Sequence, residues 1–253
     1  MAVTDGERAG DGPTGTGATA SPGGSGADGP LDIEVRVDTS FTRVYQFLRV
    51  LVRGLNAILF RTTVDGADLV PSTGPVIIAP IHRSFIDFFV ASEVTPRKLH
   101  YMAKDSLWKN GFLARILPAV GAFPVHRQSA DREALRRAQQ VLDAGEVLIL
   151  FPEGERRVGP VVEDLHEGVA FLAARTGATV VPVGIGGSAS VMPKGKRLPR
   201  PRHIHLVVGK PLDPPARTGA GRVSRSTIHR LTEELTASLQ DLYDRSVTAT
   251  GRY

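Results

Sequence analysis

The chain has no cysteine among its 253 residues, and no segment of it reaches 18 consecutive apolar residues. The first absence excludes disulfide bonds, zinc sites built on thiolates and a cysteine nucleophile. Because residues 1–29 also lack an apolar core, we expect neither a membrane-spanning helix nor a secretory signal. The seven histidines lack the spacing of a metal site, so we expect no metal ion.

Two common catalytic motifs are missing as well: the chain has no G-x-S-x-G nucleophile elbow and no P-loop. A G-x-G-x-x-A dinucleotide pattern does occur at residues 184–189, after an expected strand. However, Pro193, Gly195 and Pro199 follow it, so the helix that dinucleotide binding requires cannot form. We therefore reject a dinucleotide site.

The charge is unevenly distributed along a chain of otherwise ordinary globular composition. The formal net charge is +5, and residues 1–30 hold four acidic residues and one basic residue. That segment therefore carries −3 and the remainder +8. A basic folded part favours anionic partners, namely phosphorylated metabolites, acidic lipid or nucleic acid.

Three regions follow from the patterning. Residues 1–30 are Gly, Ala, Thr, Ser, Pro and Asp with little to bury, so we expect a disordered tail. Residues 31–61 contain an amphipathic helix over 41–60, with Arg49, Arg53 and Asn56 on its polar side. That helix either packs on its own domain or lies in a membrane interface. Residues 62–247 form the main domain.

Within the main domain, short apolar runs alternate with helical patterns. Strands are expected at 62–65, 75–80, 99–103, 122–125, 147–151, 179–183 and 204–208. Helices are expected from residue 84 to before Pro96, at 107–117, after Ser129 as far as Gly145, at 169–175 and at 228–242. This alternation predicts an α/β fold with a mostly parallel central sheet flanked by helices, preceded by the N-terminal amphipathic helix.

The residues after the strand at 75–80 carry the main chemical signal. His82 lies on the expected loop, Ser84 can cap the next helix, and Asp87 lies in its first turn. The imidazole can therefore fold back onto the carboxylate, which leaves its other nitrogen free to take a proton from a hydroxyl. Ser84-x-x-Asp87 is also a capping box, so Asp87 could serve only the backbone.

Other strands also end in charged residues. Lys104, Arg127 and Arg156 each follow an expected strand, as does Glu153. Because the carboxyl ends of parallel strands meet at one edge of a sheet, these side chains would converge beside His82. Arginine grips phosphate with two parallel hydrogen bonds, which indicates a phosphate-bearing substrate. The alternative is that the arginines are ordinary surface charges.

A basic, proline-broken stretch covers residues 194–202. It could bind nucleic acid, but it has no interleaved aromatic residues and no recognisable reading motif. A solvated loop, or contact with anionic lipid, explains it more simply.

Taken in order, these blocks resemble the glycerolipid acyltransferase family typified by 1-acyl-glycerol-3-phosphate acyltransferase. The matching blocks are His82-Arg-Ser-Phe-Ile-Asp87, Gly121-Ala-Phe-Pro-Val-His-Arg127, Phe151-Pro-Glu-Gly-Glu-Arg156 and Val181-Pro-Val183. The resemblance implies His82 and Asp87 as catalytic residues. It implies Lys104, Arg127, Glu153, Gly154 and Arg156 as substrate-binding residues.

The resemblance also implies the reaction and its setting. An acyl group would move from acyl-CoA or an acyl-carrier protein to a hydroxyl of a lysophospholipid, with no further cofactor. The enzyme would sit peripherally on the cytoplasmic side of the cell membrane and bind no nucleic acid. Acylation of another polyol, and a non-catalytic scaffold on a lipid surface, remain open.

Overall fold

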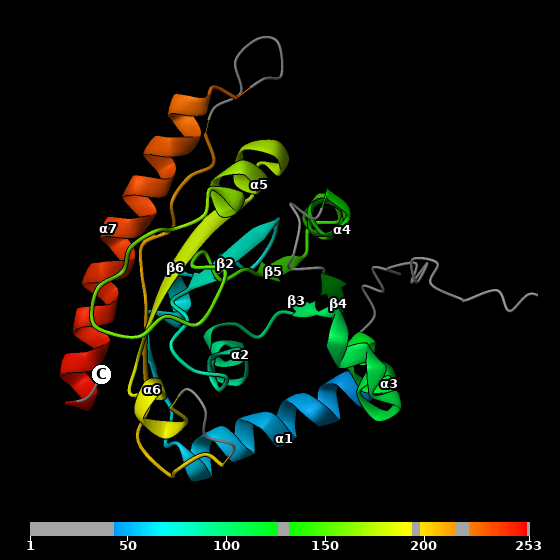
Figure 1. The fold of residues 1–253 in the computed structure, drawn as a ribbon, viewed down its shortest axis with the longest axis vertical. Coiled ribbons are helices and arrows are strands. Elements are labelled where there is room, and N and C mark those ends of the chain that lie inside the picture. Colours follow the sequence, from blue (N-terminus) through cyan, green and yellow to red (C-terminus); the bar gives the residue numbers. More distant parts are fainter. Residues whose placement is uncertain (1–42, 126–131, 194–197, 216–222, 252–253) are drawn as a thin grey trace, which may run out of the picture. The chain divides into compact units, whose positions relative to one another are not determined.

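A computed structural model describes residues 43–125, 132–193, 198–215 and 223–251. Within these ranges seven strands form one sheet in the order β1-β7-β6-β2-β5-β3-β4. Figure 1 labels five of them, from β6 through β2, β5 and β3 to the edge strand β4. All neighbouring pairs are parallel except β6 with β7. The strands are β1 (Thr63–Asp65), β2 (Val76–Pro80), β3 (Leu99–Lys104), β4 (Ala122–Val125), β5 (Val147–Ile149), β6 (Thr179–Gly186) and β7 (His205–Val208). The predicted mostly parallel α/β fold is confirmed.

The described helices separate into two groups around this sheet. They are α1 (Arg43–Leu59), α2 (Asp87–Val90), α3 (Gly111–Ala119), α4 (Arg132–Asp143), α5 (Gly168–Thr176), α6 (Ser188–Val191) and α7 (Arg225–Thr250). Helices α4, α5 and α7 contact one another in turn and cover one side, whereas α1 and α2 contact each other on the opposite side (Figure 1). Short 3₁₀ turns, η1 (Ala67–Leu69), η2 (Ala91–Val94) and η3 (Asp105–Lys109), complete the described helical elements.

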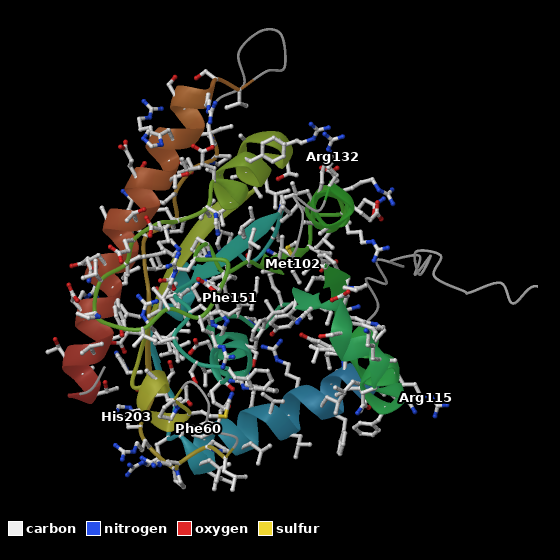
Figure 2. All side chains as sticks on the ribbon, viewed as in Figure 1. Phe60, Met102, Arg115, Arg132, Phe151 and His203 are labelled. Carbon is white, nitrogen blue, oxygen red and sulfur yellow. The ribbon has the colours of Figure 1, made fainter. Side chains whose placement is uncertain are left out.

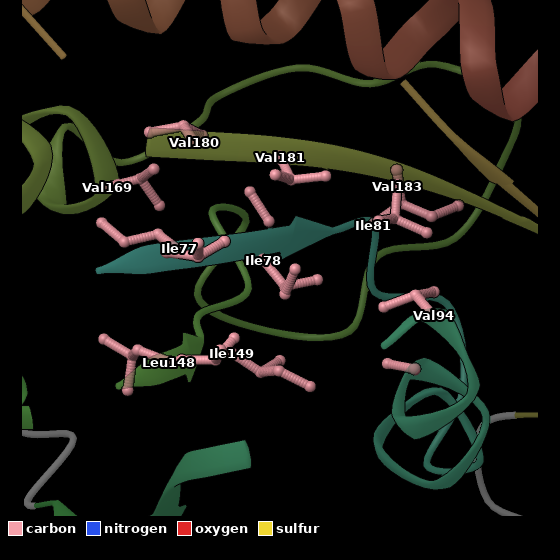
Figure 3. Packing of buried hydrophobic residues seen from close by; sticks show 14 of the residues in the cluster. Ile77, Ile78, Ile81, Val94, Leu148, Ile149, Val169, Val180, Val181 and Val183 are labelled. Atoms are coloured by element: carbon pink, nitrogen blue, oxygen red, sulfur yellow. The ribbon is translucent and has the colours of Figure 1, made fainter. Parts of the chain in front are cut away.

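The central strand β2 is buried along its whole length because it lies between β5 and β6. Its side chains Ile77 and Ile78 pack against Leu148 of β5 and Val181 of β6 in the core (Figure 3). A strand that is covered on both faces has a continuous apolar sequence, which is why residues 76–79 could be predicted as a buried strand. The loop that follows β2 therefore continues directly from the buried centre of the sheet.

The long C-terminal helix α7 approaches the sheet closely where β6 has glycines. A Cβ added at Gly184 would lie 2.3 Å from the carbonyl oxygen of Leu242, and one at Gly186 would lie 2.1 Å from that of Ser246. These glycines let the helix backbone rest almost directly on the strand, which is their role in this fold.

Helix α1 turns two polar residues, Arg49 and Asn56, towards the protein. The Arg49 guanidinium donates to the carbonyl oxygens of Thr95 and Arg97, the latter at 2.9 Å. Asn56 donates to the Phe89 carbonyl at 3.2 Å and to the Glu93 carboxylate at 2.9 Å. The apolar residues Phe47, Val50, Leu51, Leu55 and Ile58 are left exposed. Tyr45, Leu48 and Val52 nevertheless face the domain. The simpler expectation, that α1 packs its apolar face on its own domain, therefore holds for part of that face only.

The helical pattern expected at 107–117 is divided into η3 and α3, and Gly111 begins α3. Asn110 caps α3 by accepting from the backbone N–H of Phe112 and Leu113. One local detail differs from the sequence expectations. Helix α2 begins at Asp87 with Ile86 at its N-cap, so Ser84 is not the helix cap. None of the described helices combines the length and apolar character needed to cross a bilayer.

Candidate active site

The loop between β2 and α2 brings His82 and Asp87 together. The Nδ1 atom of His82 lies 3.1 Å from Oδ2 of Asp87, and both side chains are almost completely buried. A carboxylate only accepts, so Nδ1–H donates and Nε2 is left as the free acceptor of the ring. The juxtaposition expected from the five-residue spacing is therefore present.

The Asp87 carboxylate also organises the backbone of this loop. The same Oδ2 atom accepts from the backbone N–H of Arg83 at 2.7 Å and of Ser84 at 2.6 Å. Asp87 therefore also serves backbone donors of the turn, as the alternative interpretation expected, although Ser84 does not cap α2. One carboxylate both shapes the turn and holds the imidazole.

Aromatic rings flank the imidazole. Phe151 lies two residues beyond β5, near the centre of the molecule as viewed in Figure 2. Its ring lies 4.2 Å from that of His82 between centroids. The ring of Phe88 meets His82 edge-on at 5.4 Å and Phe151 at 4.7 Å. With the Asp87 bond, these contacts restrict the imidazole to one orientation.

His82 lines a largely apolar cavity of about 430 Å³. Helix α1 forms one wall and the phenylalanines of the 85–89 segment another, with β3, β4 and the end of α3 completing it. The lining residues are Tyr45, Leu48, Arg49, Val52, His82, Phe85, Phe88, Phe89, Ser92, Tyr101, Ala103, Lys104, Leu107, Leu117, Val120, Ala122 and Arg156. The volume falls within the range of small-molecule sites, and the lining suits an aliphatic chain.

Two of the three predicted cationic residues line this cavity. Lys104 ends β3, and Arg156 comes from the long loop after β5. They meet His82 there because β2, β5 and β3 are neighbours whose carboxyl ends share one edge. Arg127, the third, lies outside the described residues.

Glu153 is completely buried and does not line the cavity. Its Oε2 atom accepts from the backbone N–H of His82 at 2.7 Å, and its Oε1 atom accepts from the Arg83 guanidinium. Both oxygens are thus used within the protein. This geometry suits a carboxylate that holds the catalytic loop, whereas the sequence had grouped Glu153 with the substrate-binding residues.

Gly154 also lies away from the cavity lining. Its φ is +68°, and an added Cβ would lie 2.6 Å from the His166 ring. Only glycine combines this left-handed backbone with so close a neighbour. Its contribution in this structure is therefore a sharp turn immediately before Arg156.

Sequence reasoning did not single out Arg49 and Tyr101 as cavity residues. The sequence placed Arg49 on the polar face of the helix, towards water or lipid headgroups, whereas the packing of α1 on η2 turns it towards the cavity. Burial raises the pKa of Tyr101, so its hydroxyl stays neutral and the cavity wall stays uncharged there. The aromatic position within strand β3 was the one available signal for Tyr101.

The fold and site together define a class of enzyme. A histidine–carboxylate pair, an apolar cavity and cations at the carboxyl edge of a parallel sheet suit group transfer involving a lipid-like, anionic substrate. Within the described residues, no group of three or more His, Cys, Asp or Glu side chains could hold a metal ion.

The chain belongs to the acyltransferase family, and it is an acyltransferase: the model of the family described as Acyltransferase matches residues 61–186. It is 25% identical over 203 residues to the 1-acyl-sn-glycerol-3-phosphate acyltransferase of Bacillus subtilis, covering 80% of this chain and 98% of that protein. It is 27% identical over 162 residues to a Chlamydomonas reinhardtii protein of the same name, covering 62% of this chain and 48% of that protein.

Among solved structures, the fold matches the 1-acyl-sn-glycerophosphate (LPA) acyltransferase PlsC from Thermotoga maritima. The TM-score is 0.64 at 22% sequence identity, and the match covers 83% of this chain and 80% of that chain. This likeness confirms the architecture of the sheet and its helices.

Proposed function

We propose that this acyltransferase moves a fatty acyl group from an acyl thioester to a free hydroxyl of a glycerol-phosphate lipid, with 1-acyl-glycerol-3-phosphate as the favoured acceptor. The observation that carries the proposal is the buried His82–Asp87 pair, which lines the same apolar cavity as Lys104 and Arg156. The names of the Bacillus subtilis and Chlamydomonas reinhardtii relatives support the choice of acceptor.

In this proposal His82 is the general base. Its Nε2 atom takes the proton of the acceptor hydroxyl as the oxygen attacks the thioester carbonyl, and Asp87 stabilises the imidazolium through Nδ1–H. The tetrahedral intermediate then collapses with loss of the thiolate, which receives the proton from Nε2. The new ester and a free thiol are the products, and no acyl-enzyme is formed, consistent with a chain that has no cysteine.

The cations bind the acceptor and the cavity holds the acyl chain. Lys104 and Arg156 supply the charge for the acceptor phosphate, and we assign Arg127 to the same task from its place in the sequence. The aliphatic and aromatic lining suits the donor's hydrocarbon chain, whether CoA or a carrier protein bears it. No further cofactor is needed for this chemistry.

The exposed face of α1 supports a peripheral position on the cytoplasmic side of the cell membrane. An apolar stripe faces solvent while Arg49 and Asn56 face the protein, which is unusual for a helix that serves only to cover its own domain. An acyl-chain region would satisfy that stripe where water does not. The same helix walls the cavity, so substrates could pass between bilayer and site over a short path.

The test of the acceptor is a thioester-release assay over a panel of glycerol-3-phosphate, 1-acyl-glycerol-3-phosphate, other lysophospholipids and uncharged polyols. We expect release with 1-acyl-glycerol-3-phosphate, and a raised acceptor KM in Arg156→Ala. Preference for an uncharged polyol would contradict the assigned acceptor. No release with any acceptor would favour a non-catalytic lipid-surface scaffold.

A further inference from the structure

The Arg83 guanidinium takes no part in the chemistry proposed above, yet it is among the most deeply buried charges of the described chain. Its side chain is 1% exposed, and it does not line the cavity. A buried cation is costly unless its N–H groups find acceptors. The acceptors that Arg83 finds therefore show what this residue holds together.

Each nitrogen of the guanidinium donates to a different residue of the 153–161 segment. Nη1 pairs with the Glu153 carboxylate, Nε donates to the Gly159 carbonyl at 3.2 Å, and Nη2 donates to the Val161 carbonyl at 3.0 Å. The ring of Tyr243 from α7 lies 5.0 Å from the guanidinium carbon, in the position of a cation–π contact. A planar fork can satisfy these directions at once, whereas a single ammonium cannot.

These contacts join the loop that carries the base to the segment that carries a phosphate-binding cation. His82 is the neighbour of Arg83 in the chain, and Arg156 belongs to the 153–161 segment that Arg83 binds. The segments also meet directly, because the backbone N–H of Arg157 donates to the His82 carbonyl at 2.9 Å and that of His82 donates to Glu153. The position of Arg156 relative to the imidazole thus depends on one buried network.

Helix α7 supports the network from outside. The Gln240 side chain accepts from the backbone N–H of Val162 at 2.8 Å and donates to the Pro160 carbonyl at 3.1 Å. It therefore fixes the same loop that Arg83 holds from within.

We propose that Arg83 is a positioning residue for acyl transfer. By tying the His82 loop to the 153–161 segment through Glu153, it sets the distance between the base and the cation that anchors the acceptor phosphate. This inference rests on the proposed function, since it needs an acceptor held at both points. A small displacement of either segment would move the acceptor hydroxyl away from Nε2.

The experiment compares Arg83→Gln and Arg83→Lys with Arg97→Gln. Arg97 is a matched control because it also bridges loops through carbonyls, those of Pro71 at 3.2 Å and Gly145 at 2.6 Å, at the opposite end of the strands. The folded fraction is measured by circular dichroism at the assay temperature. Rates and acceptor KM values are then expressed per folded molecule.

We expect Arg83→Gln to lower kcat by about 10²-fold, the scale of a displaced reacting group, and to raise the acceptor KM. Arg83→Lys keeps the charge beside Glu153, so we expect its melting temperature to lie closer to that of the wild type. Its kcat should still be lowered nearly as much as in Arg83→Gln, because the ammonium cannot make the forked contacts. Arg97→Gln should lower the melting temperature and leave kcat per folded molecule unchanged.

If Arg83→Gln loses no more activity per folded molecule than Arg97→Gln, Arg83 is only structural and the inference is wrong. If Arg83→Gln does not fold, Arg83→Met with Glu153→Gln removes both charges and is judged by the same criterion. A wild type that transfers no acyl group overturns the proposed function itself, whereas an active wild type with a fully active Arg83→Gln overturns this inference alone.

Discussion

The Asp87 carboxylate has two tasks, and a substitution can separate them. In Asp87→Asn the amide oxygen can still accept from the backbone N–H groups of Arg83 and Ser84, but the imidazole loses its anionic partner. We expect kcat to fall by about 10²-fold or more, because the base is no longer oriented and its cation is no longer stabilised. Steady-state kinetics and a melting curve measure the two effects. A lower melting temperature with unchanged kcat would mean that Asp87 only caps the turn.

His100 gives the stability of the protein a defined dependence on pH. Burial, and then the nearby charge of Lys98, lowers the pKa of His100 from 6.5 to about 4. The pKa of His100 is lower in the folded protein than in the unfolded chain, so folding is favoured when the imidazole is neutral. This contribution to stability is fully present above pH 6.5 and is lost as the pH falls towards 4. The slope is about 1.4 kcal/mol per pH unit.

Urea unfolding at about pH 7.5 and about pH 5.5 tests this dependence. We expect the free energy of unfolding to fall by about 1 kcal/mol more in the wild type than in His100→Leu, which cannot titrate at this position. Parallel losses in the two proteins would show that His100 is not responsible.

At the residue scale, the sequence predicted what is local and missed what depends on packing. The His82–Asp87 pair was predictable because only the short loop between β2 and α2 separates the two residues. The buried pairing of Glu153 with Arg83 was not predictable, because it requires β2 and β5 to be neighbours in the sheet. The order of the strands cannot be inferred from either segment alone. Glu153 was therefore grouped with the substrate-binding residues, as the family resemblance of its block implied.

At the scale of elements, the contact between α7 and β6 depends on glycine. In Gly186→Ala the new methyl group would lie 2.1 Å from the Ser246 carbonyl, and neither backbone can move without disturbing the core. We expect a loss of about 2–3 kcal/mol in the free energy of unfolding. Denaturant unfolding measures it.

Gly54→Ala in α1 is the matched control, since nothing lies within 4 Å of the added Cβ. It should stabilise the helix by about 0.5–1 kcal/mol. Equal effects of the two substitutions would contradict the close approach of α7.

The exposed side of α1 can be tested without disturbing the fold. Val50 and Ile58 are 71% and 78% exposed, so we expect Val50→Glu with Ile58→Glu to leave the melting temperature unchanged. Liposome binding should fall about ten-fold or more, because each buried apolar side chain contributes about 1.5–3 kcal/mol. Phe171→Glu on α5, on the other side of the sheet, is the control and should bind normally. Unchanged binding of the double variant would refute the membrane face.

The elements themselves were largely predictable, because apolar runs bounded by Pro, Gly and Asp mark each strand. The direction in which α1 faces was not. Periodicity identifies an apolar side and a polar side, but it does not say which side meets the protein. Here the Thr95 carbonyl and the Glu93 carboxylate accept hydrogen bonds from Arg49 and Asn56, so part of the polar side meets the protein and part of the apolar side is exposed.

For the whole molecule, the account links a membrane-facing helix, an apolar cavity and a charged site in one continuous region. Helix α1 exposes apolar side chains on one side and lines the cavity with Leu48 and Val52 on the other. The basic balance of residues 31–253 suits both an anionic bilayer and a phosphate-bearing acceptor. The helix, the cavity and the cations serve acyl transfer only if His82 acts as the general base.

The most direct measurement is therefore the rate of thioester consumption with formation of acylated product, in the wild type and in His82→Ala, with 1-acyl-glycerol-3-phosphate as acceptor. The account predicts transfer by the wild type and a loss of at least about 10²-fold in the variant, whose circular dichroism should match that of the wild type. A folded His82→Ala protein that turns over at the wild-type rate would contradict it.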